Sequence, residues 1–193
     1  MLLEQSAAEP FLDQVRANPI NAALIDRLPA LALPDCWLVA GCLFETIWNV
    51  RTGRPPDEFI DDYDVFYFDD SDLSYEAEDS VIARVSAACA NLGARIEVKN
   101  QARVHLWYRQ RFGHDYPRLR SSTDGIDRFL VECTCIAVGC NADVGSRVYA
   151  TYGLDDMYAG ILRSNVRNPS AVLYGKKTGS YQRRWPWLRV TDR

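Results

Sequence analysis

The chain has 193 residues, of which 48% are hydrophobic and 25% are charged, and its formal net charge is −4 at pH 7. These values are ordinary for a globular protein with a substantial core, and the negative charge argues against a protein that coats nucleic acid. No apolar run approaches the roughly 20 residues that span a bilayer. The first residues also lack the basic and apolar regions of a secretion signal. We therefore expect a cytoplasmic protein without membrane contact.

The cysteines predict buried, reduced thiols rather than a metal site. No pair has CxxC spacing, and the chain has only two histidines, so a structural zinc site is not expected. Most of the cysteines stand within apolar runs, where a free thiol behaves as a small hydrophobe. Reduced thiols are typical of the cytoplasm. The cysteines are Cys36, Cys42, Cys89, Cys133, Cys135 and Cys140.

Helical and strand-like patterns alternate through the first hundred residues. Apolar residues at helical spacing predict helices, and short β-branched or alternating runs predict strands. Gly93 stands where a helix C-cap glycine belongs. The expected elements are a helix over 11–28 that Pro19 interrupts, a strand over 36–40, a helix over 43–50, a strand over 60–68, a helix over 75–92 and a half-buried strand over 94–99.

The second half gives weaker patterns. Residues 103–109 alternate like another strand, and 122–124 resemble a helix N-cap before a helix over 126–130. Residues 133–140 fit either a strand or the end of that helix, and a short helix begins at 154. From Pro169 the chain reads as a mixed basic tail whose tryptophans favour core packing over base stacking. We expect one α/β domain with a mixed sheet, a catalytic core over 30–150 and a C-terminal extension over 151–193.

Two carboxylates, Asp62 and Asp64, stand near the start of the predicted strand over 60–68. Side chains two residues apart in a strand point the same way, so both lie on one face. Like charges held together on an apolar strand are costly unless a cation lies between them. Mg²⁺ prefers carboxylate oxygens and substrate phosphates, so this pair predicts a magnesium site.

A glycine separates the predicted strand over 36–40 from the helix that follows it. Gly41 at a strand-to-helix turn allows backbone N–H groups to approach a phosphate closely. A metal-binding strand together with a phosphate-binding turn predicts phosphoryl or nucleotidyl transfer.

Charges are distributed unevenly along the chain. Every charged residue from Asp57 to Asp79 is a carboxylate, whereas most Lys and Arg residues follow Glu97. Opposite charges grouped in one small domain fit a metal pocket that faces anion-binding groups. The alternative is that these charges lie on solvated loops.

The order of these motifs resembles a known superfamily. Gly41-Cys42, then Asp62-x-Asp64, then a carboxylate on a later strand at Glu97, resembles the DNA polymerase β-type nucleotidyltransferases. More closely, the chain resembles a bacterial family of nucleotidyltransferase-like proteins over 33–190. The segments that carry this closer resemblance are 62–69, 98–105, 152–156 and 184–188.

The resemblance implies a polymerase β-type fold of the α/β (α+β) class, with a mixed β-sheet flanked by helices. It implies transfer of a nucleoside monophosphate from an NTP to an unidentified acceptor, which is a small molecule, a protein or RNA. The implied catalytic residues and ligands of Mg²⁺ (or Mn²⁺) are Asp62, Asp64 and Glu97. The residues expected to hold the nucleotide are Gly41, Cys42, Lys99 and Arg103.

Cys42 stands where the superfamily usually has Ser or Gly. A thiol is a weak donor, so phosphate binding is expected to rest on backbone N–H groups, and Cys42→Ser is expected to be tolerated and to favour transfer. Glu97 has a second interpretation, as a surface charge paired with Arg95 or Lys99.

Two rival functions stay open. The chain is alternatively a non-catalytic nucleotide-binding or regulatory module that kept the fold, or an interaction protein whose acidic block faces solvent. In the enzyme, the carboxylates of Asp62, Asp64 and Glu97 are expected to converge beside Gly41. The sequence does not indicate an oligomeric state.

Overall fold

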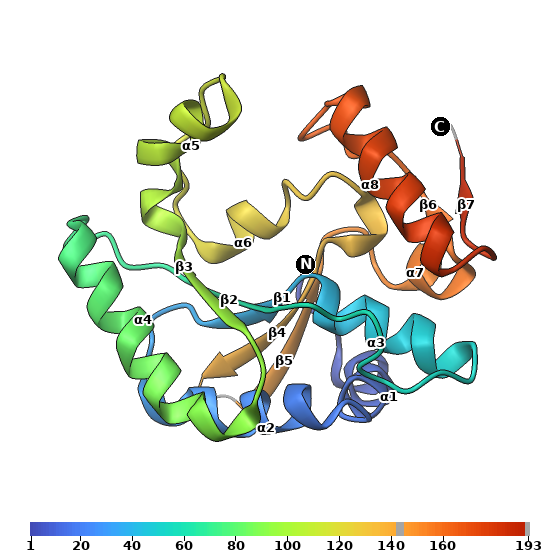
Figure 1. Cartoon of the computed structure of the whole chain (residues 1–193), viewed down its shortest axis with the longest axis horizontal. Helices are drawn as coiled ribbons and strands as arrows, with labels where there is room; N and C mark the ends of the chain where they lie inside the picture. The colour runs from blue at the N-terminus through green and yellow to red at the C-terminus, as the bar shows by residue number, and fades with distance from the viewer. Residues whose placement is uncertain (142–144, 192–193) are drawn as a thin grey trace.

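A computed structural model describes residues 1–141 and 145–191. Its centre is a five-stranded sheet with strand order β3-β2-β1-β4-β5 (Figure 1). β2 and β3 run parallel, and the other neighbouring strands of this sheet run antiparallel, which confirms the predicted mixed sheet. The strands are β1 (Trp37–Val39), β2 (Tyr63–Tyr67), β3 (Ile96–Asn100), β4 (Ile136–Asn141) and β5 (Gly145–Ala150), with a separate pair of β6 (Ile161–Leu162) and β7 (Arg189–Val190).

Helices flank the sheet on both sides. In Figure 1, α1 and α2 lie below the strands, α3 lies to their right and α4 lies beside β3, while α5 and α8 rise above the sheet with α6 between them. The helices are α1 (Gln5–Val15), α2 (Pro19–Arg27), α3 (Gly41–Arg51), α4 (Tyr75–Cys89), α5 (Val104–Phe112), α6 (Ser122–Ile126), α7 (Asp155–Ala159) and α8 (Ala171–Arg184).

The two faces of the sheet have different surroundings. Leu38 and Val65 are paired across β1 and β2, and both are fully buried in the larger core with α1 to α4. Their neighbours Trp37 and Phe66 are also paired, but alternation points them to the other face, into a smaller apolar cluster with Ile126 of α6. The second face is therefore only partly covered by apolar residues.

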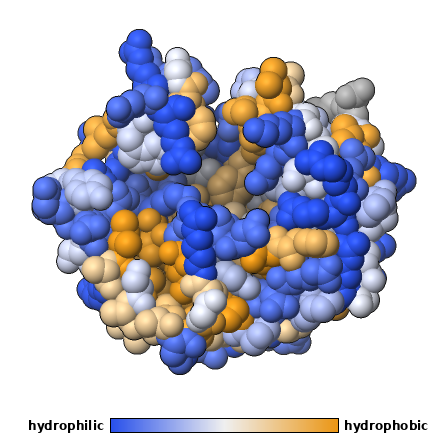
Figure 2. Space-filling model, in the orientation of Figure 1, coloured by the Kyte–Doolittle hydropathy of each residue, from blue (hydrophilic) through white to orange (hydrophobic). Residues whose placement is uncertain are grey.

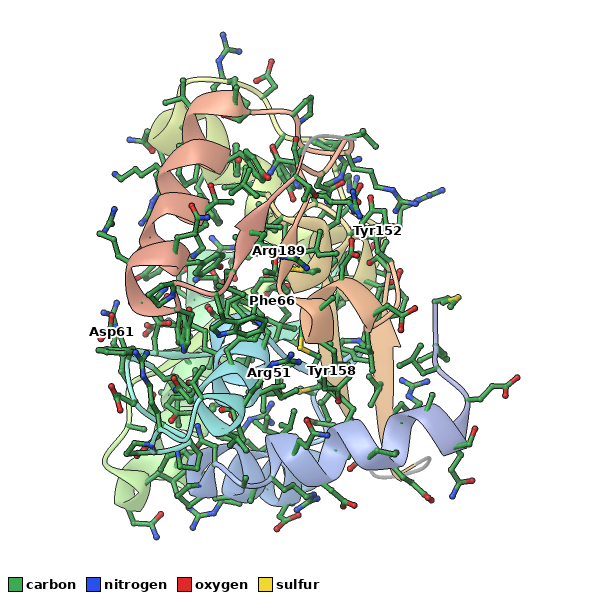
Figure 3. The ribbon with its side chains drawn as sticks, turned by 90° about the vertical axis from the view of Figure 1, so that its right-hand side faces the viewer. Arg51, Asp61, Phe66, Tyr152, Tyr158 and Arg189 are labelled. Atoms are coloured by element: carbon green, nitrogen blue, oxygen red, sulfur yellow. The ribbon has the colours of Figure 1, made fainter. Side chains whose placement is uncertain are left out.

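Aromatic packing joins the C-terminal helix to the core. The ring of Trp48 on α3 lies 5.4 Å from Tyr181 and 5.3 Å from Trp185, centroid to centroid. Trp185 is fully buried, which confirms the core interpretation of that tryptophan. Figure 3 shows a neighbouring link, in which Arg51 of α3 lies beside Tyr158 of α7 and donates to its backbone oxygen.

Capping residues explain several element boundaries that the sequence predicted. Asn18 caps α2, because its Oδ1 accepts a hydrogen bond from the backbone of Ile20 at 2.9 Å and Pro19 occupies the first turn. Ser74 caps α4. Gly93 follows the helical region in the left-handed conformation, with φ of 64°, as expected.

Three expectations for the second half are wrong. Residues 103–109 are not a strand, because Asn100 caps a short turn over Gln101–Arg103 that leads directly into α5. The predicted helix over 126–130 is displaced, because Ser121 caps α6 and that helix ends at Ile126. The basic tail contains α8, whose apolar residues pack against α3.

The cysteines are all free and buried, as the sequence predicted. In the part of the chain that the structure describes, no helix is both long enough and apolar enough to cross a membrane.

The turn between β1 and α3 is made by a strained residue. Ala40 has φ of 65° and ψ of −145°, a conformation that costs a non-glycine residue about 1–3 kcal/mol. We expect Ala40→Gly to raise the free energy of unfolding by about 1 kcal/mol in urea denaturation, because glycine adopts this conformation without strain. Ala22→Gly, inside α2, is the control and is expected to lower it by about 1 kcal/mol. A loss of stability in Ala40→Gly would contradict this account.

Candidate active site

Polar side chains of β2 and β3 share the second face of the sheet. Asp64 is paired with Glu97, and Phe66 with Lys99, in the parallel register of these strands. Paired residues point to the same face, so all of them lie on the face that carries Phe66. Asp62, which the sequence placed within the same strand, lies just before β2 and outside the paired register. The register therefore brings Asp64, the second acid of the Asp-x-Asp motif, beside a carboxylate and a lysine from a distant segment.

Lys99 bridges the two paired carboxylates. Its Nζ lies 3.1 Å from Oδ1 of Asp64 and 2.8 Å from Oε2 of Glu97, and Arg95 also pairs with Glu97. The ammonium thus lies between Asp64 and Glu97, whereas the sequence predicted a cation between Asp62 and Asp64. This geometry also matches the second interpretation of Glu97, in which it pairs with its strand neighbours.

Electrostatics distinguish the two carboxylates. Burial raises the pKa of Asp64, and Lys99 only partly offsets this. The hydrogen bond from Lys99 lowers the pKa of Glu97, which is more exposed to solvent. Burial acts to lower the pKa of Lys99, but Asp64 and Glu97 outweigh it, so the pKa of Lys99 is raised. One ammonium is shared by two acids, so a further cation beside Asp64 would stabilise its ionised form.

The N-terminus of α3 lies at the same place. Val39, the last residue of β1, is paired with Asp64, and α3 begins two residues later at Gly41. The first N–H groups of a helix have no partner within the helix, which makes them donors for an anion. A Cβ atom at Gly41 would lie 3.4 Å from the carboxyl carbon of Glu45, which is an ordinary van der Waals contact.

A cavity of about 520 Å³ covers this face of the sheet. Figure 2 shows the molecule hollowed here, between the raised parts formed by α5 and α8. Asp64, Glu97 and Lys99 line it from the sheet, aromatic residues of α5 line it from one side, and Lys177 and Tyr181 line it from α8. Its volume falls in the range of about 300–1,000 Å³ that is typical of small-molecule sites.

Four of the predicted site residues line this cavity together: Gly41, Asp64, Glu97 and Lys99. Asp62 does not line it, but its negative charge helps to raise the pKa of Asp64 and the pKa of Cys42. Asp62 therefore lies close to the two motif residues. The structure leaves the side chains of Cys42 and Arg103 outside the cavity.

Cys42 points into the core rather than toward a bound phosphate. Its thiol is fully buried and donates to the backbone oxygen of Val39 at 3.2 Å. Burial raises the pKa of Cys42 well above its usual value, so the sulfur stays protonated. The side chain of Cys42 thus has no route to phosphate, and only its backbone N–H remains available for that role.

Arg103 is turned away because its segment is helical rather than extended. Its guanidinium pairs with Glu78 of α4, and its Nε donates to the backbone oxygen of Leu73 at 3.0 Å. Both side chains of this ion pair are largely buried. Arg103 therefore fixes α4 to the start of α5, and it is not brought to the cavity.

The buried position of Cys42 changes the expectation for Cys42→Ser. The hydroxyl can donate to Val39 as the thiol does, so we expect the free energy of unfolding to change by less than about 1 kcal/mol. Nucleotide affinity should equal that of the wild type, because the side chain does not face the cavity. Calorimetric titration with NTPs measures this, and a marked gain in affinity would restore the phosphate role of residue 42.

The three predicted carboxylates, Asp62, Asp64 and Glu97, are not gathered into a group of three metal ligands. Nowhere in residues 1–141 and 145–191 do three or more His, Cys, Asp or Glu side chains gather as a metal-binding group. Glu97 is instead held by Arg95 and Lys99. Mg²⁺ in proteins is commonly held by one or two carboxylates together with substrate phosphates, so Asp62 and Asp64 are a donor set that fits it.

Sequence reasoning missed further cations that face the cavity, Arg111, Arg128 and Lys177. Among the described residues, none of these three makes a salt bridge. It also missed the aromatic wall that includes Trp107 and Tyr108. The available signal was the mixture of basic and aromatic residues after position 103. A helical interpretation of that segment would have placed them together on one helix beside the sheet.

A family model described as "Nucleotidyltransferase" matches residues 26–190. The chain belongs to this nucleotidyltransferase family. The resemblance inferred from its motifs is thereby confirmed, and so is the prediction that the protein is a transferase of this class. No curated protein matches this chain.

Solved structures show the same fold. An NMR structure described as a CCA-adding enzyme head domain is similar over 96% of this chain and 96% of that chain, with a TM-score of 0.74 and 24% identity. The Thermotoga maritima CCA-adding enzyme with tRNA has a TM-score of 0.53, 11% identity, and coverage of 96% of this chain and 42% of that chain. A CCA-adding enzyme with CTP has a TM-score of 0.52, 10% identity, and coverage of 96% and 43%. This chain thus covers less than half the length of each of the two ligand-bound enzymes.

Proposed function

We propose that this nucleotidyltransferase moves a nucleoside monophosphate from an NTP to a hydroxyl group of an acceptor in a metal-dependent reaction. The acceptor oxygen forms a bond to the α-phosphorus, the bond between that phosphorus and the bridging oxygen breaks, and pyrophosphate leaves. The hydroxyl proton is released to water. Family membership supports the transfer, and the metal and the acceptor are our proposals.

The observation that carries the proposal is the meeting of three features in one cavity. Asp64, Lys99 and the helix N-terminus at Gly41 all line it, although they come from separate elements. An acid whose pKa burial raises, next to donors suited to phosphate, is the arrangement expected where a cation and a triphosphate bind together.

We assign the metal to Asp62 and Asp64, with Mg²⁺ or Mn²⁺ as the ion. A divalent cation held there would supply charge neutralisation at the reacting phosphate and would lower the pKa of the attacking hydroxyl. Glu97 is kept as a proposed third ligand. It can take that role only if Lys99 exchanges its contact with Glu97 for a contact with a phosphate oxygen.

The remaining cavity residues suit the triphosphate. Backbone N–H groups at Gly41 and Cys42 would donate hydrogen bonds to an anion at the start of α3. Lys99, Lys177 and Arg111 supply positive charge on three sides. The nucleotide is thus held mainly by backbone dipoles and basic side chains.

Acceptor classes remain a small molecule, a protein or RNA. The similar CCA-adding enzymes were solved with tRNA and with CTP, which makes RNA the first class to test here. We also propose a cytoplasmic location, since the free and buried cysteines suit a reducing compartment.

The test is a panel of NTPs, each added with Mg²⁺, with Mn²⁺ or with EDTA. At least one NTP should raise the unfolding temperature only when the divalent ion is present, because ligands stabilise the state that binds them. Pyrophosphate release should then appear when RNA, peptide or small-molecule acceptors are added. If no NTP stabilises the protein under any condition, the proposal fails.

A non-catalytic nucleotide-binding module is the second candidate. The observation that favours it is the ion pairing of Lys99, whose ammonium already neutralises Asp64 and Glu97 as a metal would. This module would be stabilised by an NTP without a divalent ion and would release no pyrophosphate with any acceptor. The same panel therefore separates the two candidates.

A further inference from the structure

A second cavity, of about 430 Å³, shares part of its lining with the first. The segment after α5 and the turn before α8 supply its other walls, including Asp115 and Arg167. The proposed transfer uses the first cavity for the NTP and leaves the second without a role. The residues common to both cavities are Tyr108, Tyr116, Arg128 and Asn168.

Aromatic rings form the wall between the two cavities. Tyr108 and Tyr116 have centroids 4.3 Å apart with planes tilted by 31°, and Phe112 lies 4.5 Å from Tyr108. Val104 is the one buried residue of α5, so these rings are not part of a core. Tyr108 lies between Phe112 and Tyr116, and both of its faces are covered. The outer face of the half-buried Tyr116, which lines both cavities, is the surface suited to stacking on a planar ring such as a nucleobase.

Arg128 supplies an uncompensated positive charge beside these rings. Its guanidinium lies 5.8 Å from the ring centroid of Tyr116, and its Nη1 donates to the backbone oxygen of Arg167 at 3.2 Å. In the described parts of the chain no carboxylate makes a salt bridge with Arg128. Asp115, the acid in this lining, is paired with Arg109 at 3.4 Å. The wall therefore favours an anion.

We propose that the second cavity is the acceptor site and that it takes a nucleotide, with the base on the outer face of Tyr116 and a phosphate on Arg128. The assignment rests on the proposed function, because it assumes that an acceptor is needed. Arg128 disfavours cationic acceptors such as aminated sugars, and a peptide hydroxyl would leave the rings and the guanidinium unused. From this position a ribose hydroxyl can enter the first cavity and attack the α-phosphorus of the NTP, with pyrophosphate and a proton released as above.

A free mononucleotide and the 3′ end of single-stranded RNA share this chemistry, so both are used as probes. The full chain is first saturated with a non-transferable α,β-methylene NTP and Mg²⁺, so that the first cavity is occupied. Binding of a fluorescent single-stranded RNA and of each 5′-mononucleotide is then measured by titration. Binding of RNA alone identifies a nucleic-acid end as the acceptor, and binding of a mononucleotide identifies the free form. Both results support the acceptor site.

Variants assign the binding to this wall. Arg128→Gln should weaken binding of the probe at least about tenfold, because a phosphate contact is lost. The slope of the logarithm of affinity against the logarithm of salt concentration should also fall by about one. Arg120→Gln removes the same charge from an exposed position outside both cavities and should bind like the wild type. Tyr116→Leu should also weaken binding about tenfold, whereas Tyr116→Phe keeps the ring and the affinity. Thermal unfolding checks that each variant is folded.

The proposal is overturned if the NTP-saturated protein binds neither probe, or if Arg128→Gln and Arg120→Gln bind equally well. Its failure is distinguishable from failure of the proposed function. Binding of RNA that depends on Arg128, without pyrophosphate release, would contradict the proposed transfer reaction and support the acceptor site. Transfer to a non-nucleotide acceptor at full rate in Arg128→Gln would support the transfer reaction and contradict the acceptor site.

Discussion

Asp64→Asn is expected to lower the rate of nucleotidyl transfer by more than about a thousandfold. The carboxylate lines the cavity beside Gly41, and the amide that replaces it cannot supply the negative charge that holds a divalent cation. Loss of several kcal/mol of charge stabilisation at the reacting phosphate corresponds to a factor of this size. The measurement is single-turnover transfer at saturating Mg²⁺ with the acceptor that the nucleotide panel identifies.

The fold should survive this change. Burial raises the pKa of Asp64, which means that its ionised form is disfavoured in the folded protein, so the neutral Asn offsets the lost contact with Lys99. We expect the free energy of unfolding to stay within about 1 kcal/mol of the wild type. Asp61→Asn, at an exposed position of the same segment, is the matched control and should transfer at the wild-type rate. An unfolded Asp64→Asn protein would show that the acid is structural.

Arg184→Gln is expected to lower the free energy of unfolding by about 3 kcal/mol at pH 7. Nη1 of Arg184 lies 3.0 Å from Oε2 of Glu45, whose side chain is only 8% exposed. Removal of one partner of a buried pair leaves the other charge uncompensated, which typically costs about 3–5 kcal/mol. We expect a loss of free energy of unfolding at the lower end of this range, because the Arg184 side chain keeps some contact with solvent. Arg183→Gln is the control, since Arg183 is exposed and makes no ion pair in the described residues.

The loss should depend on pH in a defined direction. Burial already raises the pKa of Glu45, and Arg184 opposes that shift, so the pKa of Glu45 rises further without Arg184. An acid whose folded pKa lies above its unfolded pKa destabilises the fold as pH rises through that interval. The difference between Arg184→Gln and the wild type should therefore be largest above neutral pH and should shrink toward pH 4. Urea denaturation at several pH values measures it, and a constant difference would contradict the charge argument.

A double variant separates charge from packing. Arg184 also stacks on Trp185, with its guanidinium carbon 4.5 Å from the ring centroid. If the loss comes from the buried charge of Glu45, adding Glu45→Gln to Arg184→Gln should recover most of it, because neither charge is then left alone. If stacking dominates, the double variant should be no more stable than Arg184→Gln.

Local patterns were sufficient for much of the first hundred residues. The strands that became β1, β2 and β3 were predicted from apolar runs and from alternation, which reflect side-chain directions that every strand shares. Asn18, Pro19 and Gly93 marked helix ends, because their effects depend on neighbouring backbone groups. The shared face of Asp62 and Asp64 stays a prediction, because β2 begins at Tyr63 and leaves Asp62 outside the strand.

Residues after position 100 were harder because neighbours in space decided their structure. The alternation over 103–109 indicated a strand, but the cap at Asn100 and the ion pair of Arg103 with Glu78 stabilise a helical path. α8 has a basic sequence that reads as a tail, and it is ordered by burial of Tyr181 and of Trp185, which follows it, against α3. Neither contact is visible in a local window.

The sequence by itself determined the family, the mixed α/β class, and the Gly41 and Asp-x-Asp motifs, because these depend on residue type and on spacing within one segment. Tertiary structure alone decided which distant groups meet them. Parallel pairing of β2 with β3 set Glu97 and Lys99 beside Asp64, and the helical path after Asn100 turned Arg103 away. The two cavities exist because α5 and α8, from opposite ends of the second half, stand over one face of the sheet (Figure 1). Such pairings are settled by the packing of the whole chain, which no local pattern encodes.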